Sequence, residues 1–152
     1  MSEASGNVNG MQHPKDIGDK STMAIIFALR HEGYPVFLPF GENTRYDIVI
    51  DAGAQLRRVQ CKTGRLRQGA VVFRTCSTYG HHPNPKIVRR DYEGQIDDFA
   101  VYCPELGSVY LIPIEDVPTR TSAMLRVSPP RNGQFKRIRL AAAYEVAKID
   151  VY

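Results

Sequence analysis

Residues 46–51 read YDIVID, and residues 55–62 read QLRRVQCK. Each run is short, favours β-structure and ends in a turn-forming stretch, which is the usual signature of a strand. Only residues 52–54 (AGA) connect the two runs, a link short enough for a β-hairpin. We therefore expect two adjacent antiparallel strands, and this pair fixes which side chains of the segment meet.

The hairpin predicts a cluster of polar groups on one side of the sheet. Side chains alternate between the two faces of a strand, so Gln60 and Lys62 should share a face while Cys61 points to the other. Asp47, on the preceding strand, can reach the same face. A carboxylate oxygen of Asp47, the amide oxygen of Gln60 and the backbone carbonyl of Cys61 suit a hard divalent cation such as Mg²⁺. Lys62 would orient or deprotonate a water molecule and neutralise charge on a phosphate.

A structural interpretation of the same residues also exists. Asp47 could end its strand and pair with Arg45 or Arg58, and Lys62 could be an ordinary surface lysine. The hairpin pattern alone is compatible with either interpretation.

The remaining chain predicts one mixed domain. An apolar stretch at 20–32 (KSTMAIIFALRHE) indicates a helix, begun by Asp19 or Ser21 and ended at Gly33. The order of elements predicts an α/β (α+β) domain in which a mixed β-sheet is flanked by helices. We expect further strands at 34–39, 70–76, 99–103, 109–113 and 135–140, a helical turn at 92–98, a short helix at 114–117 and a long loop at 77–91.

Basic residues are unevenly distributed along the chain. No acidic residue occurs between Asp51 and Asp91, although the net charge of the whole chain is only +4. Arginine dominates this stretch, and its planar guanidinium suits phosphate oxygens. A polyanionic partner is therefore expected. The candidate contact residues are Arg45, Arg57, Arg58, Arg65, Arg67, Arg74, Lys86, Arg89 and Arg90, with a second cluster at Arg131, Lys136, Arg137 and Arg139.

Length and composition exclude several protein classes. The 152 residues suit one domain, and no stretch approaches the roughly 20 apolar residues that span a membrane. The polar start of the chain does not resemble a secretory signal, so we expect a cytoplasmic protein with no membrane partner. Three scattered cysteines indicate buried thiols, and the adjacent His81 and His82 indicate a solvated loop.

The polar cluster lies within a longer recognisable pattern. The segments GYPVFLPFGENTRYDIVI (33–50), VQCKTGR (59–65), QIDDFAVYCPE (95–105) and VYLIPIEDV (109–117) resemble the PD-(D/E)xK nuclease superfamily, in particular the branch containing group I intron-encoded homing endonucleases. Asp47 matches the family's Asp. Gln60-Cys61-Lys62 matches its (D/E)xK triplet with Gln first, as members of that branch also have it.

The resemblance implies a fold and an activity. It covers residues 15–117 and implies a restriction-endonuclease-like core, with a disordered tail at 1–14 and a C-terminal extension at 118–152 packed on the core. It further implies metal-dependent hydrolysis of DNA phosphodiester bonds with Mg²⁺ or Mn²⁺. One position departs from the family: Thr22 stands where members usually carry a Glu on the first helix. Asp19, one helical turn earlier, is the nearest acid that could replace it.

Three functions follow from these observations. The first is an Mg²⁺-dependent endodeoxyribonuclease that acts on double-stranded DNA as a homodimer or homotetramer. Within that class, a Holliday-junction resolvase is an alternative, because such enzymes share the fold. The second is a DNA-binding protein with a degenerate nuclease site, which the Thr22 departure favours. The third is an RNA-binding or purely structural protein, for which salt-dependent DNA binding is not expected.

Overall fold

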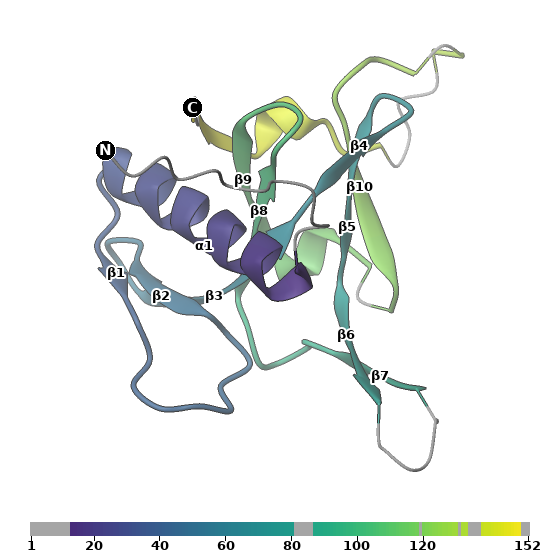
Figure 1. Ribbon diagram of the computed structural model, residues 1–152. Helices are drawn as coiled ribbons and strands as arrows, with labels where there is room; N and C mark the ends of the chain where they lie inside the picture. The colour runs from purple at the N-terminus through teal and green to yellow at the C-terminus, as the bar shows by residue number, and fades with distance from the viewer. Residues whose placement is uncertain (1–12, 81–86, 119, 131, 134–137, 150–152) are drawn as a thin grey trace, which may run out of the picture.

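A computed structural model describes residues 13–80, 87–118, 120–130, 132–133 and 138–149. Its centre is a six-stranded mixed sheet (Figure 1). In this sheet β3 and β8 are parallel, and every other neighbouring pair is antiparallel. In spatial order the strands are β1 (Val36–Phe37), β2 (Ile48–Asp51), β3 (Leu56–Thr63), β8 (Asp98–Cys103), β9 (Ser108–Pro113) and β11 (Glu145–Lys148).

One long helix, α1 (Pro14–His31), covers one face of this sheet. It begins earlier than expected, because His13 is the N-cap residue and accepts a hydrogen bond from the Lys15 backbone N–H, so neither Asp19 nor Ser21 starts the helix. The helix ends as predicted before Gly33, whose φ of 94° favours glycine. Its buried side chains pack on β2, β3 and β8; they are Ser21, Ala24, Ile25, Ala28 and Leu29.

A second, three-stranded sheet covers the opposite face (Figure 1). It consists of β4 (Arg65–Arg67), β5 (Ala70–Arg74) and β10 (Ser122–Arg126), with β5 in the middle. The expectation of helices on the sheet was therefore right for one face only. Among the described residues α1 is the one α-helix, and a sheet takes the place of a second. The apolar layer between the two sheets includes Val71, Phe73, Phe99, Val101 and Leu125.

Gly64 allows the two sheets to approach each other. It lies where the chain passes from β3 into β4, and its backbone N–H donates to the carbonyl of Tyr102. A Cβ atom at this position would lie 2.6 Å from Cγ1 of Val71 and 2.8 Å from Cγ1 of Val101. Both distances are too short for any side chain, so the crossing requires glycine.

The predicted long loop at 77–91 contains a β-hairpin. The strands β6 (Cys76–Gly80) and β7 (Ile87–Asp91) pair antiparallel and project from the body below β5 (Figure 1). The sequence did not predict these strands, because a stretch rich in turn formers lacks the alternation of apolar and polar residues that marks a half-buried strand. His81, His82 and Lys86 lie outside the described residues, as do the side chains of Arg89 and Arg90.

Several shorter expectations have mixed outcomes. The short helix predicted at 114–117 is a 3-10 helix at Ile114–Asp116, whereas the strand at 34–39 shrinks to Val36–Phe37. The strand predicted at 135–140 is described only at residues 138–140, where the prediction is wrong. These residues form no strand but a single bridge between Arg126 and Leu140. A second 3-10 helix, Ala141–Ala143, leads into β11.

The three cysteines are buried free thiols, as predicted. None of the helices in the described ranges is long and apolar enough to cross a membrane.

Candidate active site

The register of the β2–β3 hairpin brings the predicted polar residues together. Ile48 pairs with Val59, so Asp47, the residue before β2, lies beside the end of β3 that carries Gln60 and Lys62. The backbone N–H of Asp47 donates to the carbonyl of Val59 at 2.9 Å, and Oδ2 of Asp47 accepts from the backbone N–H of Cys61 at 2.9 Å. Because Lys62 alternates with Cys61, its side chain shares the face of Gln60, as the sequence predicts.

The environment of the Asp47 carboxyl group disfavours its charge. Partial desolvation raises the pKa of Asp47 above the ordinary value of 3.8, and this outweighs the Cys61 hydrogen bond and the charge of Lys62, which both lower it. The residue as a whole remains exposed, so a ligand can reach the carboxylate. A bound cation would relieve the unfavourable desolvation of this charge.

Lys62 is held by an aromatic residue from a distant segment. Its Nζ donates to the hydroxyl of Tyr92 at 3.1 Å and lies 4.8 Å from the centre of the ring. Tyr92 is only 4% exposed and packs edge-on against Phe99, with ring centres 5.6 Å apart. The phenol therefore presents a fixed acceptor to a long, otherwise flexible ammonium side chain.

Arg45 contacts the same tyrosine. Its guanidinium carbon lies 4.1 Å from the centre of the Tyr92 ring. Its Nε donates to Oε1 of Gln95 at 2.6 Å, and its Nη1 donates to Oγ of Ser77 at 2.8 Å. Two basic side chains thus converge on one buried ring and concentrate positive charge there.

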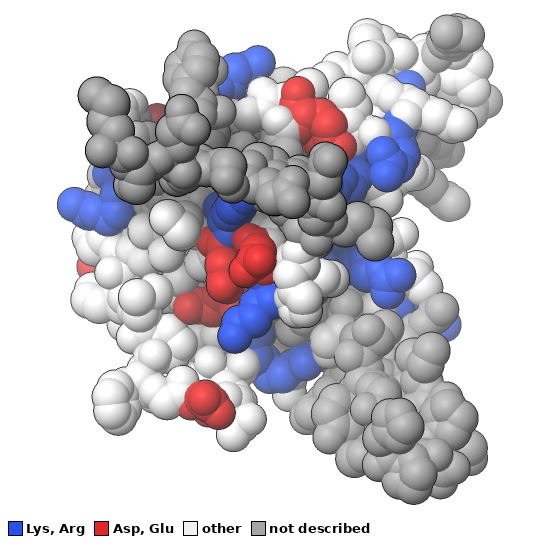
Figure 2. Space-filling view, viewed as in Figure 1, with Lys and Arg blue, Asp and Glu red and all other residues white. Residues whose placement is uncertain are grey.

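The first turns of α1 lie against the other face of β3. Oγ of Ser21 hydrogen-bonds to Oγ1 of Thr63 at 2.5 Å. The Thr22 hydroxyl donates to the carbonyl of Gly18 at 3.0 Å, and it lies near enough to the buried thiol of Cys61 to oppose the increase in that thiol's pKa that burial causes. Thr22 therefore lies next to the backbone that holds Asp47, although it carries no carboxylate. Figure 2 shows acidic side chains gathered over this end of α1, bordered by Lys and Arg. Asp19 is exposed there, one turn before Thr22.

The available donors fit a hard divalent cation. In a strand, the N–H and C=O of one residue point to the same side, so the Cys61 carbonyl faces the Asp47 side of β3, as its N–H does. Together with oxygens of Asp47 and Gln60 this makes an all-oxygen donor set, which Mg²⁺ prefers. Within the described ranges, no three His, Cys, Asp or Glu side chains form a metal-binding group, so backbone and amide oxygens must contribute.

Comparisons with known proteins agree with this geometry. A family model described as PD-(D/E)XK endonuclease matches residues 12–147. The chain belongs to the PD-(D/E)XK endonuclease family. Among solved structures, it is similar to a bacterial homing endonuclease, I-Ssp6803I, at 25% identity and a TM-score of 0.69, over 88% of this chain and 89% of that one. No curated protein sequence matches the chain.

The basic residues of this PD-(D/E)XK endonuclease fall into two groups. Some are engaged in ion pairs: Nε of Arg57 lies 2.5 Å from Oδ2 of Asp98, and Nε of Arg58 lies 3.3 Å from Oδ2 of Asp97. The buried Asp98 carboxylate binds Arg57 through two hydrogen bonds, so this guanidinium serves the fold. Arg139 likewise donates to the backbone carbonyl of Asp116.

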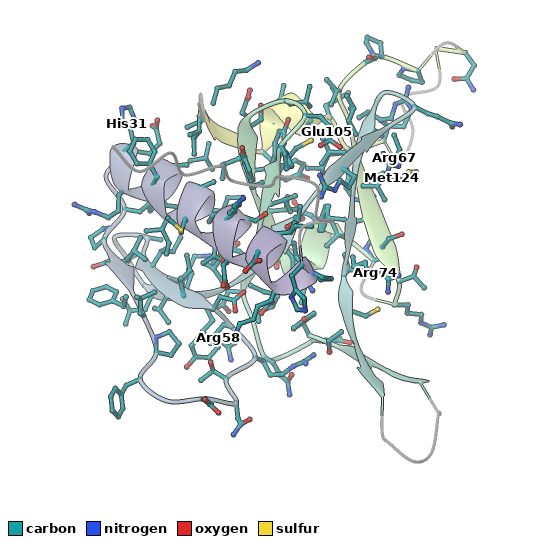
Figure 3. All side chains as sticks on the ribbon, viewed as in Figure 1. His31, Arg58, Arg67, Arg74, Glu105 and Met124 are labelled. Carbon is teal, nitrogen blue, oxygen red and sulfur yellow. The ribbon has the colours of Figure 1, made fainter. Side chains whose placement is uncertain are left out.

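The second group of arginines lines the outer face of the three-stranded sheet. Arg65 pairs with Val72 across β4 and β5, whereas the core contains their neighbours Leu66 and Val71. Figure 3 labels Arg67 and Arg74 on this sheet beside the exposed Met124. In the same figure Arg58 lies well apart from them. The outer-face arginines are Arg65, Arg67, Arg74 and Arg126. Two of them also have partners in the chain: Arg65 lies 3.8 Å from Glu105, and Arg126 donates to the carbonyls of Gln68 and Ser128.

Sequence reasoning overlooked Tyr92. This residue lies 30 positions after Lys62, and no local spacing connects the two. The parallel pairing of β3 with β8 brings the turn at 92–95 beneath the end of β3. Gln95, in the same turn, accepts a hydrogen bond from Arg45. An aromatic residue just before a predicted core strand was the one available signal.

Proposed function

We propose that this PD-(D/E)XK endonuclease hydrolyses phosphodiester bonds of double-stranded DNA in a reaction that depends on Mg²⁺ or Mn²⁺. The observation that supports it most strongly is the contact across the hairpin, in which the Asp47 carboxylate accepts from the backbone N–H of Cys61, the residue between Gln60 and Lys62. This arrangement combines a cation ligand set with an ammonium group on one face of the sheet. The similarity to a homing endonuclease supports DNA as the substrate.

Each residue has a proposed role. Asp47, the amide oxygen of Gln60 and the backbone carbonyl of Cys61 bind the cation, which when bound supplies a Lewis acid to the scissile phosphate. Lys62 orients the attacking water and balances negative charge on the phosphate. Arg45 contributes a second positive charge near the same ring. Asp19 is the proposed replacement for the acid absent at Thr22.

The outer face of the three-stranded sheet supports a role in DNA backbone binding. Arg65, Arg67 and Arg74 are candidate phosphate ligands, together with Arg89 and Arg90 on β7. Arg57 is not among them, because its guanidinium is bound to Asp98. Replacing Arg67 and Arg74 by Ala should make the slope of log K against log salt concentration shallower by about 0.9 for each phosphate that the protein no longer neutralises. An unchanged salt slope would exclude both side chains from the interface.

The nuclease proposal is tested by plasmid cleavage. We expect the protein to nick supercoiled DNA with Mg²⁺ or Mn²⁺ and to stop when EDTA is added. The Lys62→Ala variant should lose cleavage by about 100- to 1,000-fold while still binding DNA. Lys148→Ala, at an exposed position on β11, is the matched control and should cleave normally. Equal nicking by the Lys62 and Lys148 variants would remove the reaction from this site.

A second function is a DNA-binding protein that has lost cleavage. Thr22 favours it, because the position that contacts Cys61 lacks the acid that family members usually carry. Restoring that acid with Thr22→Glu distinguishes the two cases. An enzyme with a complete site should gain little, whereas a degenerate site should gain metal affinity and cleavage. Offering a four-way junction beside linear duplex in the same assay separates a junction resolvase from a duplex nuclease.

The oligomeric state is part of the proposal. One small domain covers little DNA, and two strands require two active sites, which a symmetric homodimer or homotetramer supplies. Sedimentation of the protein with and without duplex DNA tests this assembly. A monomer in both conditions would contradict it.

A further inference from the structure

The position of the Lys62 ammonium group depends on a segment outside the hairpin. A lysine side chain has four rotatable bonds, and fixing it in one geometry costs conformational entropy. Within the described structure its nearest fixed partner is Tyr92, whose hydroxyl accepts from Nζ at 3.1 Å. The ion pairs of the described residues include none between Lys62 and Asp47.

Tyr92 is itself rigidly held. It is 4% exposed, and its ring meets Phe99 edge-on at 5.6 Å between ring centres. The backbone N–H of Gln95 donates to the carbonyl of Tyr92 at 3.0 Å, which closes a turn just before β8. The side chain of Gln95 then accepts from Arg45 at 2.6 Å. One short turn therefore anchors both Lys62 and Arg45.

We infer that Tyr92 is a positioning residue that acts through Lys62. Its hydroxyl accepts a hydrogen bond from the ammonium and holds Nζ on the Gln60 face of β3, while its ring stacks with the guanidinium of Arg45. Tyr92 contacts neither metal nor phosphate in this scheme. The inference rests on the proposed nuclease function, because the position of Lys62 matters only if Lys62 takes part in the reaction.

Two substitutions separate the hydroxyl from the ring. Tyr92→Phe keeps the buried ring and its packing against Phe99 but removes the acceptor for Lys62. Tyr92→Leu removes the ring as well, and with it the stacking on Arg45. Tyr144→Phe is the matched control: its hydroxyl donates to Asp116 at 3.0 Å and to none of the proposed site residues. Thermal unfolding of each variant reports whether the fold is kept.

The first measurement does not depend on cleavage. The rate at which a trace of acetic anhydride labels Lys62 reports how free its Nζ is, with Lys148 in the same sample as the internal standard. We expect faster labelling of Lys62 in Tyr92→Phe and an unchanged rate in Tyr144→Phe. A purely structural tyrosine would leave the labelling of Lys62 relative to Lys148 unchanged, and that result would overturn the inference.

The second measurement is plasmid cleavage under saturating DNA. We expect kcat to fall by about 10- to 100-fold in Tyr92→Phe, which is the usual effect of losing a group that orients a site residue, with KM nearly unchanged. Tyr92→Leu should lose more, provided that it folds. Normal kcat in Tyr92→Phe would overturn the inference even if labelling rises. A lack of cleavage by the unsubstituted protein would instead overturn the nuclease proposal, whatever the labelling shows.

Discussion

Asp47 and Asp97 both accept a hydrogen bond from the backbone of β3, but their pKa values shift in opposite directions. Oδ2 of Asp47 accepts from the N–H of Cys61 at 2.9 Å near one end of β3, and Oδ2 of Asp97 accepts from the N–H of Arg58 at 2.7 Å near the other. Yet the pKa of Asp47 is raised and that of Asp97 is lowered. A hydrogen bond from the backbone therefore does not decide the ionisation of either group.

The difference lies in the charged partners. Desolvation alone would raise the pKa of Asp97, but hydrogen bonds and charge from Arg58, with the charge of Arg57, reverse the shift. At Asp47 desolvation prevails over the Cys61 hydrogen bond and the charge of Lys62, the one basic side chain that lowers its pKa. One end of β3 is electrostatically satisfied and supports the fold. The other keeps a carboxylate that gains from an added cation, as expected of a functional site.

The largest effect should come from neutralising the site carboxylate. Asp47→Asn keeps an oxygen that can accept from Cys61 but removes the charge that binds the cation. We expect plasmid cleavage to fall by about 100- to 1,000-fold. Without metal, the free energy of unfolding should not decrease, because a desolvated charge is removed.

The matched control is Asp51→Asn at the end of β2, where the carboxylate accepts from the backbone N–H of Gly53 at 2.8 Å. It should cleave DNA normally. If Asp47→Asn were both active and less stable than the unsubstituted protein, Asp47 would be a structural residue like Asp97.

The next-largest effect should occur at the end of β3 where Arg57 and Arg58 pair with Asp98 and Asp97. Asp98 has a side chain only 3% exposed and binds Arg57. We expect Asp98→Asn to lower the free energy of unfolding by about 3 kcal/mol, because the partly buried Arg57 loses its counter-charge. Arg65 and Glu105 lie 3.8 Å apart, and both side chains are partly exposed. Glu105→Gln should therefore lower the free energy of unfolding by less than about 1 kcal/mol. Urea unfolding measures both losses. If Asp98→Asn and Glu105→Gln lowered the free energy of unfolding equally, the buried pair would be worth no more than the exposed one.

The smallest effect is the pH dependence of stability, which should have opposite signs at the two carboxylates. The raised pKa of Asp47 gives stability that is complete below its unfolded value, near 3.8, and lost as pH rises through the folded pKa. The lowered pKa of Asp97 gives stability that is complete above 3.8 and lost as pH falls through its folded pKa.

Urea unfolding of Asp47→Asn and Asp97→Asn, compared with the unsubstituted protein across pH, measures both signs. Relative to its Asn variant, the native residue should lose stability with rising pH at position 47 and with falling pH at position 97. The same trend for both variants would show that the two carboxylates are in equivalent environments.

Sequence patterns predicted the elements whose side chains alternate clearly. The β2–β3 hairpin, the strands β8 and β9 and the end of α1 at Gly33 followed from short apolar runs and turn residues. The strands β10 and β11 were missed, because the segment after Pro118 mixes polar and apolar residues and is stabilised by pairing with β5 and β9. Their stability comes from distant partners, which local periodicity does not reveal.

The features of the candidate site also divide into those that the sequence predicted and those that it did not. The sequence by itself determined that Gln60 and Lys62 share a face of β3 and that a short hairpin brings Asp47 beside them, because side chains alternate along a strand and the turn is short. Only the tertiary structure decided which arginines pair with buried carboxylates and that Tyr92 holds Lys62. Those interactions join residues 30 to 50 positions apart. They depend on how β8 and the second sheet pack against β3, which is a property of the whole fold.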